Sequence, residues 1–139
     1  MKSKYAPLVK LKKKGLDQAE RNLIGANNAL SAATLALSDA YALLSTFTLP
    51  TSGSVGELIQ SQAIIQTQHY EIQRCADLLS NAQQQQLQMQ HHFRIARVEY
   101  EKFNYLEVQE AHAYTAKMKK EEAKMLDEIG VMTYKREIL

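Results

Sequence analysis

Apolar residues recur every seven positions over one stretch of the chain, from Val9 to Phe47. They form the two apolar classes of a heptad repeat, which are Val9, Leu16, Leu23, Leu30, Leu37 and Leu44, and then Ala19, Ala26, Ala33, Ala40 and Phe47. Such a repeat places its apolar side chains on one narrow stripe of a helix and imposes a left-handed supercoil. Because only another helix can cover that stripe, the stretch predicts a coiled coil.

The heptad pattern is interrupted once and then resumes. Pro50 and Gly53 end the first helix, and Ser54 with Glu57 forms a capping box that starts a second one. We therefore predict a single coiled-coil domain over residues 1–139, with helix 1 at about 5–47, a turn at 48–54 and helix 2 at about 55–135. A short turn makes consecutive helices antiparallel. The predicted fold class is all-α, an antiparallel hairpin of two long helices.

The position of the turn predicts how the two helices align. If the turn is centred between Ser52 and Gly53, facing residues have numbers that add up to about 105, and a positions meet d positions throughout. The predicted pairs include Ala40 with Ile65, Leu37 with Gln68, Leu30 with Cys75, and Lys12 with Phe93. Small residues mostly face large ones in this alignment, as a well-packed interior requires.

Helix 2 is predicted to extend beyond the start of helix 1, because no Pro or Gly interrupts residues 104–129. The resulting overhang is roughly 40 to 50 Å long at about 1.5 Å per residue. It carries apolar residues near one side, and an exposed apolar stripe usually marks a partner. Six lysines precede the first acidic residue of the chain, and they lie at the same end of an antiparallel hairpin. We hypothesise that one partner-binding surface contains Lys10, Lys12, Lys13, Met118, Met125 and Ile129.

The sequence offers no arrangement of residues that supports catalysis, a cofactor or a metal. Cys75 is the only cysteine, and the four histidines include no pair at the i,i+4 spacing that a metal site on a helix needs. Gly53 and Gly56 lack the preceding strand and following lysine of a phosphate-binding loop. Neither a signal peptide nor a membrane span fits the pattern of charges. We expect a non-enzymatic, cytosolic protein that is a monomer.

Several short motifs resemble the FliJ family of bacterial flagellar type III export proteins, which are coiled-coil stalks. The break between the helices reads SGSVGELI and is followed by IIQT at Ile64 to Thr67. Near the end of the chain, Glu122 is followed by Leu126, Asp127, Glu128 and Ile129. The first helix, the Gly-containing break and the longer second helix match the family's organisation across nearly the whole chain.

The resemblance implies a cytoplasmic component of the export machinery, peripheral to the inner membrane. It would insert into the hexameric ring of the export ATPase and contact the export gate, which is a membrane protein, and escort chaperones. Carried over by position, the gate contact falls on Ile64, Gln68, Glu71 and Cys75, of which Ile64 keeps the family's apolar character. The alternative is an unrelated cytosolic coiled-coil adaptor, including a helical arm that binds nucleic acid through its lysines. If the resemblance holds, we expect no nucleic acid among the partners.

Overall fold

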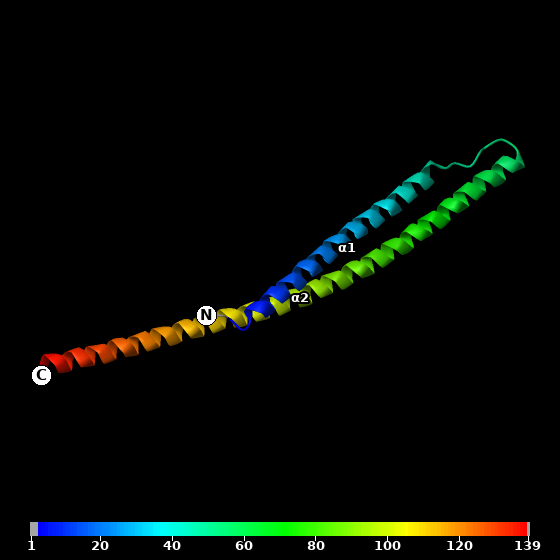
Figure 1. The fold of residues 1–139 in the computed structure, drawn as a ribbon. Helices are drawn as coiled ribbons and strands as arrows, with labels where there is room; N and C mark the ends of the chain where they lie inside the picture. The colour runs from blue at the N-terminus through cyan, green and yellow to red at the C-terminus, as the bar shows by residue number, and fades with distance from the viewer. Residues whose placement is uncertain (1–2, 139) are drawn as a thin grey trace. The chain divides into compact units, whose positions relative to one another are not determined.

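The computed structural model describes residues 3–138, which form two helices and no strand. Helix α1 spans Ala6–Thr46 and helix α2 spans Val55–Ile138. The predicted all-α fold, with a longer second helix packed against the first, is confirmed (Figure 1). By their contacts the residues fall into two units: unit 2 is Asp17–Ile95, and unit 1 joins the chain up to Leu16 with the chain from Ala96 onward.

Local hydrogen bonds explain where α1 begins and ends. The hydroxyl of Ser3 accepts a bond from the backbone N–H of Tyr5 (3.1 Å), and Pro7 lies in the first turn, where its missing N–H costs nothing. In the last turn the hydroxyls of Ser45 and Thr46 donate to backbone carbonyls three residues earlier (2.6 Å each). The last carbonyls of an α-helix have no N–H donor within the helix, so such bonds help to satisfy this end of α1. Pro50 then prevents α1 from resuming.

The start of α2 has the cap that the sequence predicts. The hydroxyl of Ser54 accepts a hydrogen bond from the backbone N–H of Glu57 (3.2 Å). Gly53, directly before it, has a φ of +136°, a conformation that residues with a Cβ rarely adopt. A glycine is therefore needed where the chain turns into α2.

Burial follows the predicted heptad classes closely. On α1, every a and d position from Val9 to Phe47 is buried or half-buried. On α2, where the predicted apolar class begins at Leu58, the same holds from Ile65 to Phe103, but Leu58 itself is exposed. The most buried side chains are Leu16, Ala19, Ala26, Ala40, Gln68, Ile72 and Cys75. The heptad repeat therefore identifies correctly which face of each helix is covered.

Unit 2 contains a small apolar core near the end of α1. Ala40 from α1 packs with Ile72 and Cys75 from α2, and Leu37 and Leu44 cover this cluster from the side. Burying one isoleucine side chain stabilises a fold by about 1.5 to 3 kcal/mol. No side chain in the described residues is completely buried, as expected when two helices have only each other to pack against.

The alignment of the two helices differs from the predicted one by about one heptad. Ala40 was predicted to face Ile65, but its carbonyl accepts a hydrogen bond from Nε2 of Gln68 (2.8 Å), and its cluster partners lie further along α2. Lys12 was predicted to face Phe93 and instead pairs with Glu99 (3.6 Å). The predicted pairs Leu37 with Gln68 and Leu30 with Cys75 are wrong by the same shift, since Leu37 packs against the cluster that contains Cys75.

The cause of this difference is the connection between the helices. The prediction assumed a tight turn, whereas residues 47–54 run outward from the end of α1 to a more distant start of α2 (Figure 1). The first turns of α2 therefore have no facing turn of α1, and Val55 and Ile59 are exposed. A slide of one heptad keeps a positions opposite d positions, so the repeat alone does not distinguish the two alignments.

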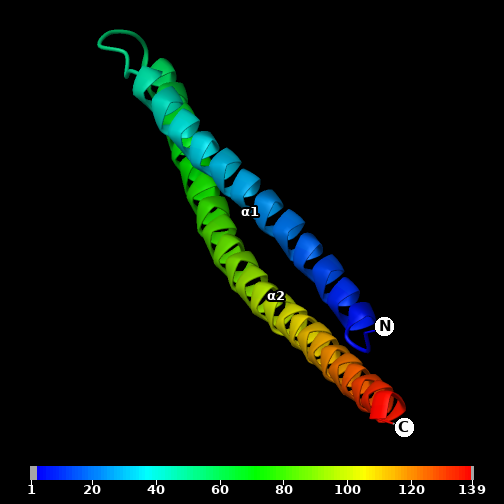
Figure 2. The same ribbon diagram turned by 90° about the vertical axis from the view of Figure 1, so that its left-hand side faces the viewer.

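In unit 1, α2 extends well beyond the start of α1. The backbone N–H of Lys4 donates to Oε1 of Glu110 (3.2 Å), and every residue from 111 to 137 is exposed. The overhang, defined here as residues 111–137, is therefore about 40 Å long. Figure 2 shows this part of α2 as a continuous helix up to its end. The predicted overhang is confirmed.

Candidate partner-binding surfaces

The lysines near the start of α1 lie against aromatic and acidic residues of α2 in unit 1. Nζ of Lys12 lies 3.6 Å from Glu99 and 5.5 Å from the ring centre of Phe103. Nζ of Lys13 lies 5.4 Å from the ring centre of Tyr100. Each ammonium thus gains a cation–π contact, and Lys12 also gains an ion pair. These two lysines stabilise unit 1 as well as contributing positive charge to its surface.

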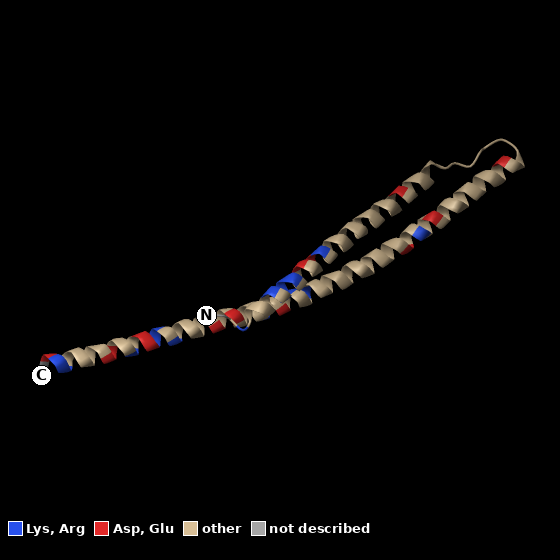
Figure 3. Cartoon of the chain, in the orientation of Figure 1, with Lys and Arg blue, Asp and Glu red and all other residues tan. Residues whose placement is uncertain are grey.

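Charge is concentrated in unit 1 (Figure 3). The charged residues of unit 2 are Asp17, Glu20, Arg21, Asp39, Glu57, Glu71, Arg74, Asp77 and Arg94. All other charged residues belong to unit 1, where the basic start of α1 and the mixed charges of the overhang are found. A charged surface accelerates the encounter with a partner of opposite charge.

The overhang exposes a series of large apolar side chains. Met118 is 38% exposed, Met125 61% and Ile129 54%, and Leu126, Val131 and Met132 are exposed as well. Two shallow clefts lie between these residues and the charged ones, one near Lys124 and Val131 and one near Ile129 and Arg136. Methionine side chains adapt their shape to a partner, so this stretch suits a helix that packs against another protein.

The structure separates two parts of the surface that the sequence predicted to be one. Lys12 lies beside Phe103, and Met118 follows Phe103 by fifteen residues of one helix. At about 1.5 Å per residue this is about 22 Å, with Ile129 still further away. Lys10 is exposed on α1 near Lys12 and Lys13. The six predicted residues therefore form a basic patch and a separate apolar stripe.

The four residues predicted to contact the export gate differ in accessibility. Ile64 is 53% exposed, whereas Gln68 is 8% and Cys75 4% exposed in the core of unit 2. Glu71 lies at the edge, where Arg74 donates two hydrogen bonds to its carboxylate, one of 3.0 Å. These hydrogen bonds lower the pKa of Glu71 below its ordinary value of 4.5. Only Ile64 and Glu71 are therefore available to a partner in this conformation.

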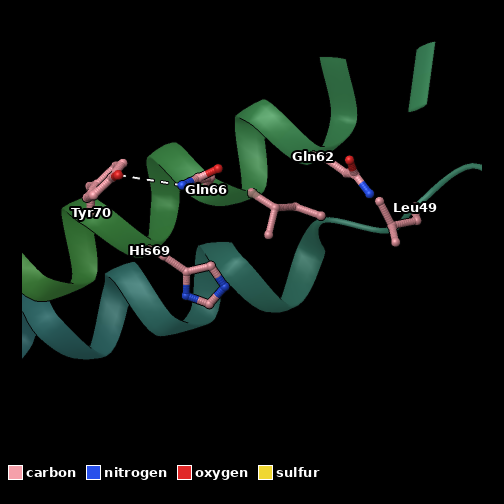
Figure 4. Close-up of a pocket in the computed structure, with 6 residues that line it drawn as sticks. Leu49, Gln62, Gln66, His69 and Tyr70 are labelled. Atoms are coloured by element: carbon pink, nitrogen blue, oxygen red, sulfur yellow. Dashed lines mark hydrogen bonds between the residues drawn. The ribbon is translucent and has the colours of Figure 1, made fainter. Parts of the chain in front are cut away.

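A cleft beside these residues was not predicted from the sequence. It lies between the connection and the early turns of α2 and is lined by Leu49, Gln62, Ile65, Gln66, His69 and Tyr70 (Figure 4). Nε2 of Gln66 donates a hydrogen bond to the hydroxyl of Tyr70 (3.5 Å). The cleft lies near the end of α1, where Leu49 of the connection meets the early turns of α2. Its signal in the sequence was weak, since only the exact helix alignment reveals which apolar residues stay uncovered.

The described residues contain no group of three or more potential metal ligands. Among them, too, no helix combines the length and the apolar character needed to cross a membrane. Cys75 is a buried free thiol whose sulfur lies 3.7 Å from the carboxylate of Glu71. A thiol packed in a core behaves as a small apolar group.

The comparison with protein families supplies the remaining observation. The model of the FliJ family, described as flagellar FliJ protein, matches residues 1–138. The chain belongs to the FliJ family. This membership confirms the resemblance seen in the short motifs, and it makes the chain a coiled-coil protein related to flagellar export. No curated protein and no solved structure matches the chain.

Proposed function

We propose that this FliJ family member is a non-enzymatic component of the flagellar type III export machinery that engages the export ATPase ring as a stalk. In this proposal it also links the ring to the export gate and to escort chaperones, from the cytoplasmic side of the inner membrane. The observation that carries the proposal is the family match over residues 1–138, combined with an overhang whose apolar side chains have no cover within the described residues.

Unit 1 is the proposed contact for the ATPase. Its basic patch at Lys10, Lys12 and Lys13 supplies positive charge, and the stripe at Met118, Met125 and Ile129 supplies adaptable apolar contacts. A ring offers a stalk several similar but not identical positions. Flexible methionines and charges that act over a distance fit such a task better than one rigid, close-packed interface would.

The start of α2 in unit 2 is the proposed contact for the gate. Ile64 and Glu71 are accessible there, and the neighbouring cleft at Leu49 and Tyr70 adds apolar surface. Gln68 and Cys75, which the family resemblance also implicated, support this surface from within the core rather than forming it. The gate contact is therefore proposed to centre on Ile64 and the cleft.

One experiment with two variants tests both contacts. The full chain, a chain truncated after Tyr114 and an Ile64→Asp chain are each mixed with the export ATPase and with the cytoplasmic part of the gate protein. We expect truncation to abolish stimulation of ATPase turnover and leave gate binding intact, because unit 2 is unchanged. We expect Ile64→Asp to weaken gate binding at least about tenfold, since a carboxylate replaces an apolar contact.

Controls keep this test independent of folding. Ile64 is exposed, so Ile64→Asp should leave the melting temperature nearly unchanged, and Gln84→Asp on the exposed side of α2 provides a matched charge control. A truncated chain that stimulates the ATPase as well as the full chain contradicts the proposed role of the overhang. Tight nucleic-acid binding that weakens steeply with salt and depends on Lys10 and Lys13 would instead support a nucleic-acid-binding arm.

A further inference from the structure

Two alignments of the same two helices satisfy the heptad repeat. In the observed alignment Ala40 lies with Gln68, Ile72 and Cys75. An alignment shifted by one heptad, in which facing residue numbers add up to about 105, also pairs every a position with a d position. It places Ala40 opposite Ile65, a small residue against a large one, and Phe47 opposite Leu58, two large apolar residues. The apolar repeat therefore permits both alignments.

Features outside the repeat distinguish the two alignments. In the observed one, the amide of Gln68 donates to the carbonyl of Ala40, whereas the shifted one places Gln68 against Leu37. In the observed one, Lys12 has Glu99 and Phe103 as partners, whereas the shifted one places it against Phe93. A buried amide without a partner costs free energy, so these contacts favour the observed alignment. They are few, and each is worth little.

The observed alignment also has a cost at the connection between the helices. Residues 47–54 are drawn out along the start of α2, and the first turns of α2 leave Val55, Leu58 and Ile59 exposed. The shifted alignment covers Leu58 with Phe47 and relaxes the connection. Burying one leucine side chain stabilises a fold by an amount comparable to what these few polar contacts supply together.

We propose that the pair of helices has two registers, in which α1 slides by one heptad along α2 and the bond from Gln68 to Ala40 favours the observed register. The slide is about 10 Å. It moves Phe47 and the end of α1 over the start of α2, so that α1 covers Ile65, which lines the cleft. The second register is a minor state of the free protein. This inference concerns the fold of the chain and does not depend on the proposed partners.

The single native cysteine provides a direct test, because Cys75 lies at the centre of the core. A disulfide requires Cα atoms within about 7 Å of each other. Leu37→Cys places a second thiol in the cluster that contains Cys75 in the observed register. Leu30→Cys faces Cys75 only after a slide of one heptad, and Leu23→Cys only after a slide of two. The full chain carrying each substitution is oxidised at low protein concentration, and the rate of intramolecular disulfide formation is measured by mass spectrometry.

We expect Leu37→Cys to close fastest. If the second register is populated at about 0.1 to 10%, Leu30→Cys closes about 10 to 1,000 times more slowly than Leu37→Cys. Leu23→Cys should close at least about ten times more slowly again, because neither of the two proposed registers brings it to Cys75. A rate for Leu30→Cys no higher than that for Leu23→Cys overturns the proposal, as does a rate for Leu37→Cys no higher than that for Leu30→Cys.

A second substitution tests the role of Gln68. Adding Gln68→Leu removes the bond to Ala40, which exists only in the observed register. The ratio of the Leu30→Cys rate to the Leu37→Cys rate should then rise at least about threefold, the change expected for a hydrogen bond worth about 0.7 kcal/mol. An unchanged ratio contradicts the proposal that this bond favours the observed register. Far-ultraviolet circular dichroism of every variant verifies that the helices are still formed.

Discussion

Unit 2 and unit 1 are built from the same two helices but are stabilised in different ways. In unit 2 the contacts are mainly apolar, with Ala40, Ile72 and Cys75 at the centre and few charges. In unit 1 the contacts between the helices include Lys12 with Glu99 and Phe103, and Lys4 with Glu110. The apolar residues of a heptad repeat look alike from one heptad to the next, so they stabilise the hairpin without fixing how the two helices align. A charged or polar contact that occurs only once in the hairpin fixes the alignment but adds little stability.

The largest expected effect comes from placing a charge in the apolar core of unit 2. Ile72 is 8% exposed, and Ile72→Asp would bury a carboxylate with no cationic partner facing it from α1. We expect a loss of about 3 to 5 kcal/mol in the free energy of unfolding, enough to unfold a hairpin of this kind at room temperature. Thermal unfolding followed by circular dichroism measures the change.

Gln84→Asp is the matched control for this substitution. Gln84 lies on the exposed face of α2 in the same unit, so the same new charge remains in water. We expect its melting temperature to stay within a few degrees of that of the parent chain. Similar melting temperatures for the two variants would show that unit 2 does not depend on its apolar core.

The fold could be predicted to this level because the heptad repeat encodes which residues are covered. Val9 to Phe47 on α1 and Ile65 to Phe103 on α2 were assigned to the covered face correctly. The alignment could not be predicted, because every shift by seven residues preserves the same classes. The deciding contacts, such as Gln68 with Ala40, depend on polar groups whose partners are set only once the helices are paired.

The candidate surfaces were predictable only in part for the same reason. Met118 and Ile129 are exposed as expected, because their exposure depends on the length of α2 alone. The burial of Gln68 and the cleft beside Tyr70 depend on where α1 ends relative to α2, which the sequence did not reveal. Exposure that depends on one helix could therefore be predicted from the sequence, whereas burial that depends on the alignment of two helices could not.

A smaller effect is expected from Lys12, which makes an ion pair and a cation–π contact between the helices of unit 1. Lys12→Met keeps the apolar stem but removes the ion pair with Glu99 and the cation–π contact with Phe103. Because both charged side chains are partly exposed, we expect a loss of only about 0.5 to 1 kcal/mol at low salt. This loss should shrink in about 1 M salt, where the ion pair is screened.

Lys14→Met provides the control in unit 1, because Lys14 is exposed on the same turn of α1. We expect it to change stability by less than Lys12→Met at every salt concentration. Ile72→Val provides the comparison in unit 2, with a loss of about 0.5 to 1.5 kcal/mol that does not shrink with salt. Equal salt dependence in the two units would remove the distinction between them.

The smallest expected effect concerns Glu71 and Arg74, a charged pair within α2 of unit 2. Hydrogen bonds from Arg74 lower the pKa of Glu71 below its ordinary value of 4.5. The pair therefore stabilises the folded state at pH values above the pKa that Glu71 has in the unfolded chain. This contribution is lost as the pH falls through the lower pKa of Glu71 in the folded chain. Titration of the Glu71 carboxylate by NMR should show Arg74→Gln raising its pKa toward 4.5. Because these hydrogen bonds join two residues of one helix, both registers of α1 and α2 retain them. Arg74→Gln should therefore leave the ratio of disulfide rates for Leu30→Cys and Leu37→Cys unchanged, whereas Gln68→Leu shifts it. A shift with Arg74→Gln as well would show that alignment depends on charges within a helix and not only on contacts between the two.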